Sequence, residues 1–421
     1  MQTENEPQTE SPNPPQKRKP FAALQYRDYR LLWLGQGVSQ IGTQMRIVAI
    51  AWQIYHLTHD PLSLGFIGLC RVVPLIASSL LGGTIADAVD RRKLLLVCQA
   101  VLFFCSVSLF LVTITGIVTV WWIYGITIAS SSVNGFERPA NSALIPALVP
   151  RNQLANALSL STLNWQIAMV SGPGLGGLII WALDVQGAYL IDSFSFIGVI
   201  GALLLIHYRP SGPSGSRISL EAAIEGFRFA WNKKILVANM LLDFVATFFG
   251  SATTLLPIFA TEILKVDELG YGLLTASEAA GAVIASFVLA WFQVGHTRKP
   301  GVWVIGAVMF YSFFTILFGF STWLPLSMLW LALVGASDTV SMVLRQTISQ
   351  LVTPDHMRGR MQSVNMIFFA GGPQLGEVEA GIVARLSGAQ FSVISGGFAC
   401  VVMVIAVGLL SRSLREYEFD K

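Results

Sequence analysis

The stretch Gly82-Gly83-Thr84-Ile85-Ala86-Asp87-Ala88-Val89-Asp90-Arg91-Arg92-Lys93 sets a cluster of charges between two long apolar runs. The run before it, 64–86, carries one charged residue, Arg71, and the run after it, 94–116, carries none. Each run is close to the ~20 apolar residues that a helix needs to cross ~30 Å of hydrocarbon. We therefore predict two membrane-spanning helices joined by a short charged loop.

The three consecutive basic residues of this loop set the expected orientation of the chain. Short cytoplasmic loops hold the excess of Lys and Arg in membrane proteins, so we place this loop in the cytoplasm. Of the 27 basic residues, 21 then fall on the cytoplasmic side, five lie in or at the ends of apolar runs, and Lys265 alone falls in an external loop. This distribution predicts that both termini are cytoplasmic.

Composition identifies an integral membrane protein. The chain has 421 residues, of which 53% are hydrophobic and 12% charged, about half the ~25% charge of an average soluble domain. The four cysteines lie in apolar runs without a CxxC pair, which favours neither a disulfide framework nor a metal site. The sequence contains no P-loop motif, and we find no nucleophile–base arrangement. We expect no enzyme activity, no catalytic residue, no cofactor, no metal and no nucleic-acid partner; the expected surroundings are a lipid bilayer.

Apolar runs of spanning length predict an all-α fold with twelve transmembrane helices in two six-helix bundles. The runs begin near residues 31, 64, 94, 120, 158, 187, 235, 269, 300, 324, 361 and 390. We divide the chain into a disordered cytoplasmic tail (1–27), an N-terminal bundle (28–206), a cytoplasmic linker with an amphipathic helix (207–234), a C-terminal bundle (235–412) and a cytoplasmic tail (413–421).

The two halves of the chain look like repeats. Around the fourth and fifth runs the sequence is PANSALIPALVPRNQLANALSLSTLNWQIAMVSGPGLGGLI (139–179), and around the tenth and eleventh it is VLRQTISQLVTPDHMRGRMQSVNMIFFAGGPQLGEVEAGI (343–382). Both stretches leave a helix at a proline, pass a short loop with arginine and end in Gly-Pro-x-x-Gly. Parallel six-helix repeats around a midplane cavity are a recurrent design of secondary transporters.

Over essentially all its spans the chain resembles the major facilitator superfamily. The Gly83-x-x-x-Asp87 and Arg91-Arg92 elements are similar to that superfamily's loop between helices two and three, although this chain has Asp90 where the superfamily usually has glycine. Gly172-Pro173-x-x-Gly176-Gly177 is similar to the fifth-helix signature of the antiporter branch. The stretches 26–42 and 136–150 resemble the bacterial exporter branch that contains the enterobactin exporter and macrolide efflux pumps.

The resemblance implies a monomeric, multi-pass transporter of the bacterial plasma (inner) membrane. It would export a small-molecule substrate, an amphipathic organic compound such as a siderophore or a drug, by proton antiport with alternating access. Two alternatives stay open: an importer or uniporter of a small metabolite, and a non-transporting membrane receptor on the same scaffold.

Three carboxyl groups within apolar runs are candidates for proton coupling: Asp338, Glu278 and Asp243. A charged side chain at the bilayer centre costs at least ~2.5 kcal/mol, so such residues usually face a cavity or a partner. A coupling carboxyl binds and releases a proton as its surroundings alternate between wet and dry. The alternative for Asp338 is permanent pairing in a network with Arg345, two helical turns away.

A further set of polar residues suits the substrate cavity. Gln36, Gln40 and Gln44 are four residues apart and fall near one stripe of a helix that also carries Arg46. The stripe either lines a polar substrate path or makes hydrogen bonds between helices, worth only ~0.6 kcal/mol each in membrane proteins. Glu377 follows a Gly-Pro pair and is a fifth cavity candidate at the external mouth.

Two glycine-containing motifs are candidates for conformational control. Asp87, with Gly83, Arg91 and Arg92, forms a predicted gating loop, because a carboxylate there can accept hydrogen bonds from a helix N-terminus in the other half; the alternative is a solvated surface charge. The other motif consists of Gly172, Pro173, Gly176 and Gly177. The proline removes a backbone donor and the glycines allow close helix packing, which predicts a kink that seals the external side, packing alone being the alternative.

Overall fold

A computed structural model of the chain describes residues 21–207, 220–250, 252–291, 299–354 and 357–418. Within these ranges the side chains of residues 80–88, 220–224, 226, 252, 290, 358–360 and 362–370 are not described. The regular elements in the described ranges are all helices.

The first half of the chain forms a group of long helices that we call the N-group. It comprises η1 (Ala22–Gln25), α1 (Arg27–Thr58), α2 (Pro61–Ala88), α3 (Arg91–Ile114), α4 (Val120–Leu148), η2 (Arg151–Gln153) and α5 (Leu154–Leu205). Helix α5 is two helices in series, because the backbone leaves the helical region at Asp184 (φ 62°, ψ 179°). The sixth apolar run, predicted to begin near residue 187, starts just after this break.

The second half forms the C-group. It comprises α7 (Lys234–Phe249), η3 (Ala252–Leu255), α8 (Leu256–Ile258), η4 (Phe259–Ile263), α9 (Glu268–Trp291), α10 (Pro300–Phe320), α11 (Leu324–Val352), α12 (Arg358–Ser387), α13 (Ala389–Leu410) and α14 (Arg412–Arg415). Helix α6 (Leu220–Asn232) precedes it, and its Ala230 packs in a small core with Leu236, Met240 and Met361.

Local sequence explains where several helices begin and end. Helix α1 ends at Thr58 because the next residue, His59, adopts the left-handed conformation (φ 49°), and α2 begins at Pro61. Proline also opens α10 at Pro300. A proline is favoured in the first turn of a helix because the N–H that it lacks would have no partner there.

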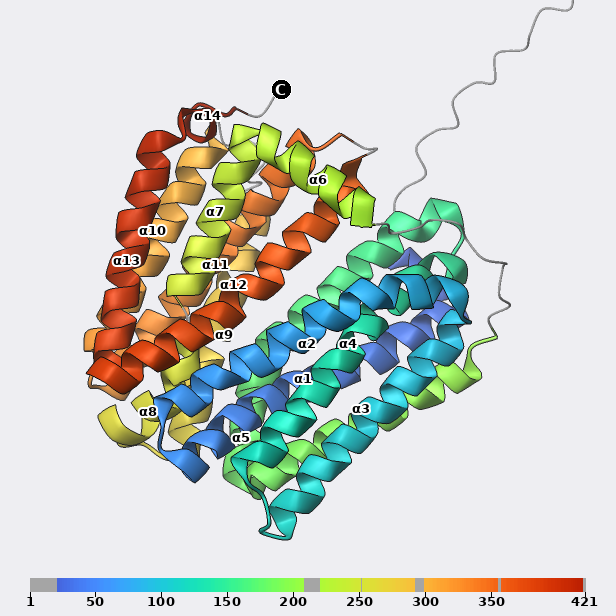
Figure 1. Ribbon diagram of the computed structural model, residues 1–421, viewed down its shortest axis with the longest axis horizontal. Coiled ribbons are helices and arrows are strands. Elements are labelled where there is room, and N and C mark those ends of the chain that lie inside the picture. The colour runs from blue at the N-terminus through green and yellow to red at the C-terminus, as the bar shows by residue number, and fades with distance from the viewer. Residues whose placement is uncertain (1–20, 208–219, 251, 292–298, 355–356, 419–421) are drawn as a thin grey trace, which may run out of the picture.

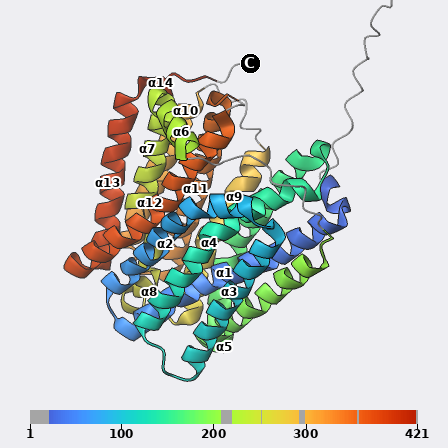
Figure 2. The ribbon, with the colours of Figure 1, turned by 45° about the vertical axis from the view of Figure 1, so that its right-hand side comes forward.

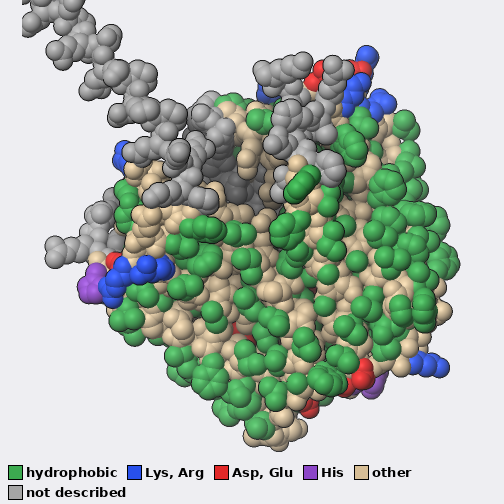
Figure 3. Space-filling model, turned by 180° about the vertical axis from the view of Figure 1, so that it is seen from behind, with side chains coloured by type: hydrophobic (Ala, Val, Ile, Leu, Met, Phe, Trp, Pro, Cys, Tyr) green, Lys and Arg blue, Asp and Glu red, His purple; other side chains and the backbone are tan. Residues whose placement is uncertain are grey.

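Eight helical stretches among the described residues are long and apolar enough to cross a membrane. One of them, residues 151–205, contains both parts of α5 and is counted once. Helices α1, α4 and α12 are not among the eight. Apolar side chains cover most of the side of the molecule seen in Figure 3, whereas many of its charged side chains lie toward the two ends. The fold is that of a multi-pass membrane protein.

The two groups of helices converge at one end of the molecule and diverge at the other (Figure 1). The diverging end carries basic segments, including Lys233 and Lys234 at the start of α7 and Arg412–Arg415 in α14, and we call it the basic end. The converging end carries the turns at residues 59–60, 115–119 and 264–267, and we call it the far end. In Figure 2 the N-group and the C-group remain distinct when the molecule is turned.

The hydrophobic cores follow the same division. One large cluster at the far end joins both groups, since it contains Trp52 and Tyr55 of the N-group and Phe259 and Tyr271 of the C-group. Two other clusters each belong to a single group: one includes Leu32, Leu144 and Leu203, and the other includes Leu242, Leu344 and Val404. The far end therefore holds the two groups together by shared apolar burial, which is non-directional and scales with the area buried.

Candidate transport site

Helices α2 and α12 cross at the far end through glycine. A Cβ on Gly68 would lie 2.2 Å from the carbonyl oxygen of Gln374, and one on Gly65 would lie 2.6 Å from that of Glu377. Both distances are far below van der Waals contact, so the two helices can cross this closely only because both residues are glycines. Near it, Nη1 of Arg71 lies 3.4 Å from Oε1 of Glu377, which places this predicted cavity residue in an ion pair between the groups.

Helices α5 and α9 cross in the same way on the other side of the molecule. A Cβ on Gly177 would lie 2.0 Å from the Cα of Gly272, and one on Gly174 would lie 2.9 Å from the Cβ of Ala276. The hydroxyl of Thr275 donates to the Pro173 carbonyl at 3.3 Å. Three residues of the glycine-proline region of α5 therefore lie in the contact between the groups.

Helix α1 adds aromatic contacts to this closure. Trp52 stacks on Tyr271 with ring centroids 4.7 Å apart, and the Tyr271 hydroxyl donates to the Val48 carbonyl at 3.3 Å. The Tyr55 hydroxyl donates to the Glu262 carboxylate. All three contacts join the N-group to the C-group at the far end, so the molecule is closed there.

A charged triad lies in the middle of the C-group. Nη1 of Arg345 on α11 lies 2.6 Å from Oδ1 of Asp243 on α7, and its Nη2 lies 3.9 Å from Oδ1 of Asp338 on α11. The side chains of Arg345, Asp243 and Asp338 are 7%, 21% and 44% exposed, respectively. Asp338 is the fifteenth of the 29 residues of α11, so this exposed carboxylate lies halfway along a helix of spanning length.

Two neighbouring residues support the triad. The side-chain amide of Asn239, one turn before Asp243 on α7, donates to the Arg345 carbonyl at 3.0 Å. Glu278 lies where α9 crosses α11, since a Cβ on Gly335 would lie 2.0 Å from the Glu278 carbonyl oxygen. Gly335 is one turn from Asp338 on α11. The structure thus pairs two of the predicted coupling residues, Asp243 and Asp338, with one arginine, and it places the third, Glu278, at a helix crossing one turn from Asp338.

The N-group holds a neutral counterpart of this triad. Helices α4 and α11 both have 29 residues, and their flanking caps, Thr119 with Trp323 and Val149 with Thr353, are 204 residues apart. The same offset relates Leu144 to Ile348 and Gly135 to Thr339, all four of which are buried. It also relates Asn141 to Arg345 and Asn134 to Asp338.

The partner of Asn141 completes the correspondence. Nδ2 of Asn141 donates to Oε1 of Gln36 on α1 at 2.9 Å, as Arg345 on α11 contacts Asp243 on α7. An amide pair in the N-group therefore occupies the place of an ion pair in the C-group. The sequence repeat around residues 139–179 and 343–382 contains this relation, but only the contacts reveal that Gln36 and Asp243 are its partners.

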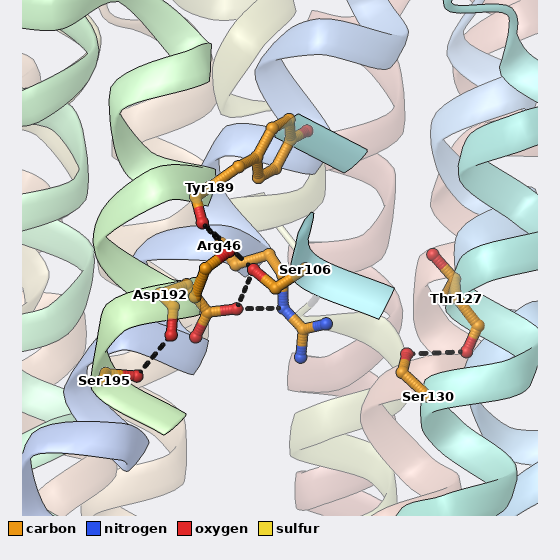
Figure 4. A network of polar contacts seen from close by, with 8 residues as sticks. Arg46, Ser106, Thr127, Ser130, Tyr189, Asp192 and Ser195 are labelled. Atoms are coloured by element: carbon orange, nitrogen blue, oxygen red, sulfur yellow. Dashed lines mark hydrogen bonds and ion pairs between the residues drawn. The ribbon is translucent and has the colours of Figure 1, made fainter. Parts of the chain in front are cut away.

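A second buried ion pair lies inside the N-group (Figure 4). Nε of Arg46 lies 3.0 Å from Oδ2 of Asp192 on α5, with 5% and 0% side-chain exposure. The Ser106 hydroxyl of α3 donates to the same carboxylate oxygen at 2.8 Å. Asp192 was missed by the sequence analysis, although an acid within the apolar run 185–206 is the kind of residue that such a search seeks. The structure thus seals Arg46, a predicted cavity residue, among α1, α3 and α5.

The other predicted cavity and helix-five residues lie between α1 and α5. Gln40 and Gln44 are half-buried, and the Gln44 side-chain amide contacts the sulfur of Met169. A Cβ on Gly172 would lie 2.3 Å from the Gln44 Cβ, and one on Gly176 would lie 3.1 Å from the Met45 Cα. These glycines allow α1 and α5 to pack closely. The helical backbone continues through Pro173, and its break comes at Asp184.

The predicted gating loop is described in part. The side chain of Asp87 and the surroundings of Gly83 are not described. Arg91 donates to the Ala143 carbonyl at 3.0 Å, and Arg92 donates to the Leu203 and Leu204 carbonyls near the end of α5 at 2.6 and 2.8 Å.

Asp90, the residue that departs from the superfamily pattern, caps α3. Its carboxylate accepts from the backbone N–H groups of Arg92 and Lys93 at 2.9 and 3.3 Å. The first four N–H groups of a helix have no partner within the helix, and aspartate is among the residues that best supply one. Asp90 therefore sets where α3 begins, a role that its position before the helix could have indicated.

Comparison with known proteins places this geometry among membrane transporters. A family model described as "Transmembrane secretion effector" matches residues 18–420. Proteins named enterobactin exporter EntS from Shigella boydii serotype 18 and Escherichia coli O81 are 25% and 24% identical to the chain, over 92% of it and 93% of each relative.

Solved structures share the fold. A POT family transporter in complex with 5-aminolevulinic acid has a TM-score of 0.73 at 12% identity, covering 92% of this chain and 96% of that one. A bacterial homologue of the human lysosomal transporter Spinster, in an inward-facing and unoccupied conformation, has a TM-score of 0.71 at 16% identity, covering 96% and 100%. At such identities the likeness establishes the fold alone.

Proposed function

Since this chain belongs to the transmembrane secretion effector family of the major facilitator superfamily, we propose that it exports an amphipathic organic compound from a bacterial cell by proton antiport. Its relatives named as exporters are bacterial, which supports a site in the plasma (inner) membrane. Their name, enterobactin exporter, favours a siderophore as substrate, with drugs as the other class.

We propose twelve spans in two six-helix repeats, with both termini in the cytoplasm. The matched lengths and caps of α4 and α11 support the repeat, and the break at Asp184 supports counting α5 as two spans. The distribution of basic residues supports a cytoplasmic basic end. The proposed units are the tail 1–27, the bundle 28–206, the linker 207–234, the bundle 235–412 and the tail 413–421; η1 lies within the first.

In this orientation the structure corresponds to an inward-facing state. The far end, which would face outward, is closed by the Gly65–Gly381 and Gly177–Gly272 crossings. Release of substrate to the outside requires these crossings to separate while the basic ends of the two groups approach each other. We assign to Gly83 and Asp87, with Arg91 and Arg92, the gate that holds the basic end closed in the opposite state.

The observation that carries proton coupling is the water-exposed carboxylate of Asp338 halfway along α11. An ionisable group at such depth is costly unless it faces a cavity or a partner. Asp338 has both, being 44% exposed and 3.9 Å from Arg345. Closure of the basic end would remove that water, which changes the affinity of the carboxyl for a proton. Asp243 and Glu278 are the further members of this coupling site.

For the substrate path we propose the stripe of Gln36, Gln40 and Gln44 on α1, with Glu377 at the far end of the cavity. Gln40 and Gln44 are half-buried, which suits residues that contact an amphipathic compound through their amide groups. Arg46, which is paired with Asp192, also stays a proposed cavity residue. Replacing both members of this pair tests its role.

The test is efflux from proteoliposomes with an imposed pH gradient, using enterobactin and cationic dyes as probes. Wild type is compared with Asp338→Asn, which keeps the shape of the side chain and removes the proton site. We expect wild type to accumulate a probe against its gradient, and Asp338→Asn to retain downhill exchange while losing at least ~10-fold in uphill flux. Glu418→Gln, the same charge change at an exposed residue after α14, is the matched control and behaves as wild type.

Three results would overturn parts of this proposal. Flux that ignores the gradient in wild type would identify a facilitator. Inward accumulation would identify an importer, and no flux of any probe together with specific binding would favour a receptor. An Asp338→Asn variant that still pumps uphill would move the coupling to Asp243 or Glu278.

A further inference from the structure

Two apolar grooves flank α10 in the half of this helix that begins at the basic end. The α10–α13 groove has a volume of about 240 Å³, and the α10–α11 groove has a volume of about 490 Å³. Val302 lines both, so the two grooves adjoin across α10. Helices α10 and α13 form the side of the C-group that is turned away from the N-group (Figure 1). The grooves are therefore separate from the path between the two groups.

The side chains that line the grooves are suited to bind hydrocarbon. Ser337 and the indole N–H of Trp303 are the polar side-chain groups that line the α10–α11 groove, and Arg415 is the one polar side chain that lines the α10–α13 groove. The other lining side chains are apolar, so hydrocarbon suits both grooves better than water does. Trp303 and Phe310 also line the α10–α11 groove and are 60% and 59% exposed, so this groove lies at the outer surface of the protein. In a bilayer that surface meets acyl chains.

Basic side chains lie at the end of the grooves where a lipid headgroup would lie. Lys299 immediately precedes α10 and is exposed. The Arg415 guanidinium donates to the Leu409 carbonyl at 3.3 Å at the end of the α10–α13 groove, and its other N–H groups can reach a phosphate. Of the acidic groups in this described segment, Glu416 is held by Arg412 at 2.7 Å and Glu418 is exposed. Arg415 and Lys299 thus present positive charge beside apolar grooves.

We propose that one anionic phospholipid binds across α10, with one acyl chain in each groove and its phosphate at Arg415 and Lys299. Two adjoining apolar grooves match the two chains of a phospholipid, and the basic residues match an anionic headgroup in the leaflet at the basic end. The α10–α11 groove is walled by Ala336 and Ser337, next to Asp338 in the sequence. The bound lipid therefore supports the helix that carries the charged triad.

The test measures thermal unfolding of the full-length, detergent-purified protein with added phosphatidylglycerol or phosphatidylcholine of identical chains. A ligand that binds only the folded state raises Tm, so we expect phosphatidylglycerol to raise it roughly twice as much as phosphatidylcholine. Gly306 lines the α10–α11 groove, and a Cβ there meets nothing within 4 Å, so Gly306→Phe places its ring in the groove from an unobstructed Cβ. This variant loses most of the lipid-dependent rise in Tm.

The matched control is Gly201→Phe, because a Cβ on Gly201 of α5 also meets nothing within 4 Å and lies outside both grooves. It keeps the full lipid effect. Arg415→Gln combined with Lys299→Gln keeps the rise with phosphatidylcholine and loses the preference for phosphatidylglycerol. Equal effects of the two lipids, or a full effect in Gly306→Phe, would overturn the proposal. So would a shift produced by inorganic phosphate alone, or a dimer in lipid-free detergent that Gly306→Phe dissociates.

Discussion

Arg46 and Asp192 form an ion pair in the N-group with 5% and 0% side-chain exposure, whereas Arg345 and Asp243 form one in the C-group with 7% and 21%. The first pair is sealed on all sides, and Ser106 fills part of the remaining hydrogen-bonding capacity of its carboxylate. The second pair borders solvent-accessible space through Asp243 and through the neighbouring Asp338, which is 44% exposed. Two pairs of the same chemistry thus differ in access to solvent.

Under the proposed mechanism, this difference separates a structural from a functional use of charge. A sealed pair keeps its protons while the molecule is folded, since no water reaches it. A pair that water reaches in one state and loses in another can exchange protons with one side of the membrane at a time. The amide pair Gln36–Asn141 strengthens the distinction, because it occupies the place of the Asp243–Arg345 pair in the N-group without any charge.

The largest effect is expected from breaking the sealed pair. Arg46→Leu leaves the Asp192 carboxylate fully buried without its counter-charge, and breaking a buried pair in this way costs about 3–5 kcal/mol. Thermal unfolding of the purified protein measures the loss, and we expect a large fall in Tm or in the yield of folded protein.

The control removes both charges together. Replacing a buried pair by apolar residues of similar volume is often neutral, so Arg46→Met combined with Asp192→Leu restores most of the stability. If the pair is purely structural, the double variant also transports at a rate near that of wild type. A folded double variant that no longer transports would instead place Arg46 in the substrate path.

How much of this arrangement the sequence predicts depends on the residue in question. The lengths of the apolar runs locate the helices well: the starts predicted near residues 94, 120, 300 and 324 lie within three residues of α3, α4, α10 and α11. The search for charges in these runs found Arg46, Asp243, Asp338 and Glu278 for the same physical reason, that charge at this depth is rare.

Partners and states are harder to predict. Arg46 and Asp192 are 146 residues apart, and no local spacing rule connects α1 to the second part of α5. Glycine composition indicates close packing at Gly177 but does not identify Gly272 as its neighbour. Nor does the sequence indicate that the far end is closed, because the same helices form both states of an alternating-access protein.

A smaller loss of stability is expected from breaking the pair in the C-group. Arg345→Leu leaves Asp243 without its partner, but water can solvate this partly exposed carboxylate, so we expect a cost of about 1–3 kcal/mol in the free energy of unfolding. Its effect on pumping is greater than its effect on folding. Thermal unfolding and uphill efflux, measured on one preparation, separate the two effects.

An amide copy of the N-group contact is the matched control. Asp243→Gln combined with Arg345→Asn reproduces the residue types of Gln36 and Asn141, which pack at the corresponding place. We expect this double variant to unfold within about 1 kcal/mol of wild type, because distant packing is unchanged, and to have lost gradient-driven efflux. If it still pumps uphill, the charges of this pair are dispensable. The difference between the ion pair of the C-group and the amide pair of the N-group would then have no role in coupling.

The smallest effect on transport is expected from placing a carboxylate at the counterpart of Asp338. Asn134→Asp introduces it on α4, where Asn141 stands in place of the arginine, so we expect unchanged coupling and, because an unpaired charge at this depth is costly, a loss of stability of about 2.5 kcal/mol. Efflux by Asn134→Asp combined with Asp338→Asn is the decisive measurement. The double variant stays uncoupled if the arginine of the triad is needed to regulate the proton site. Restored uphill efflux would show instead that any carboxylate at this depth suffices, and Arg345 would then be only a structural partner of Asp243.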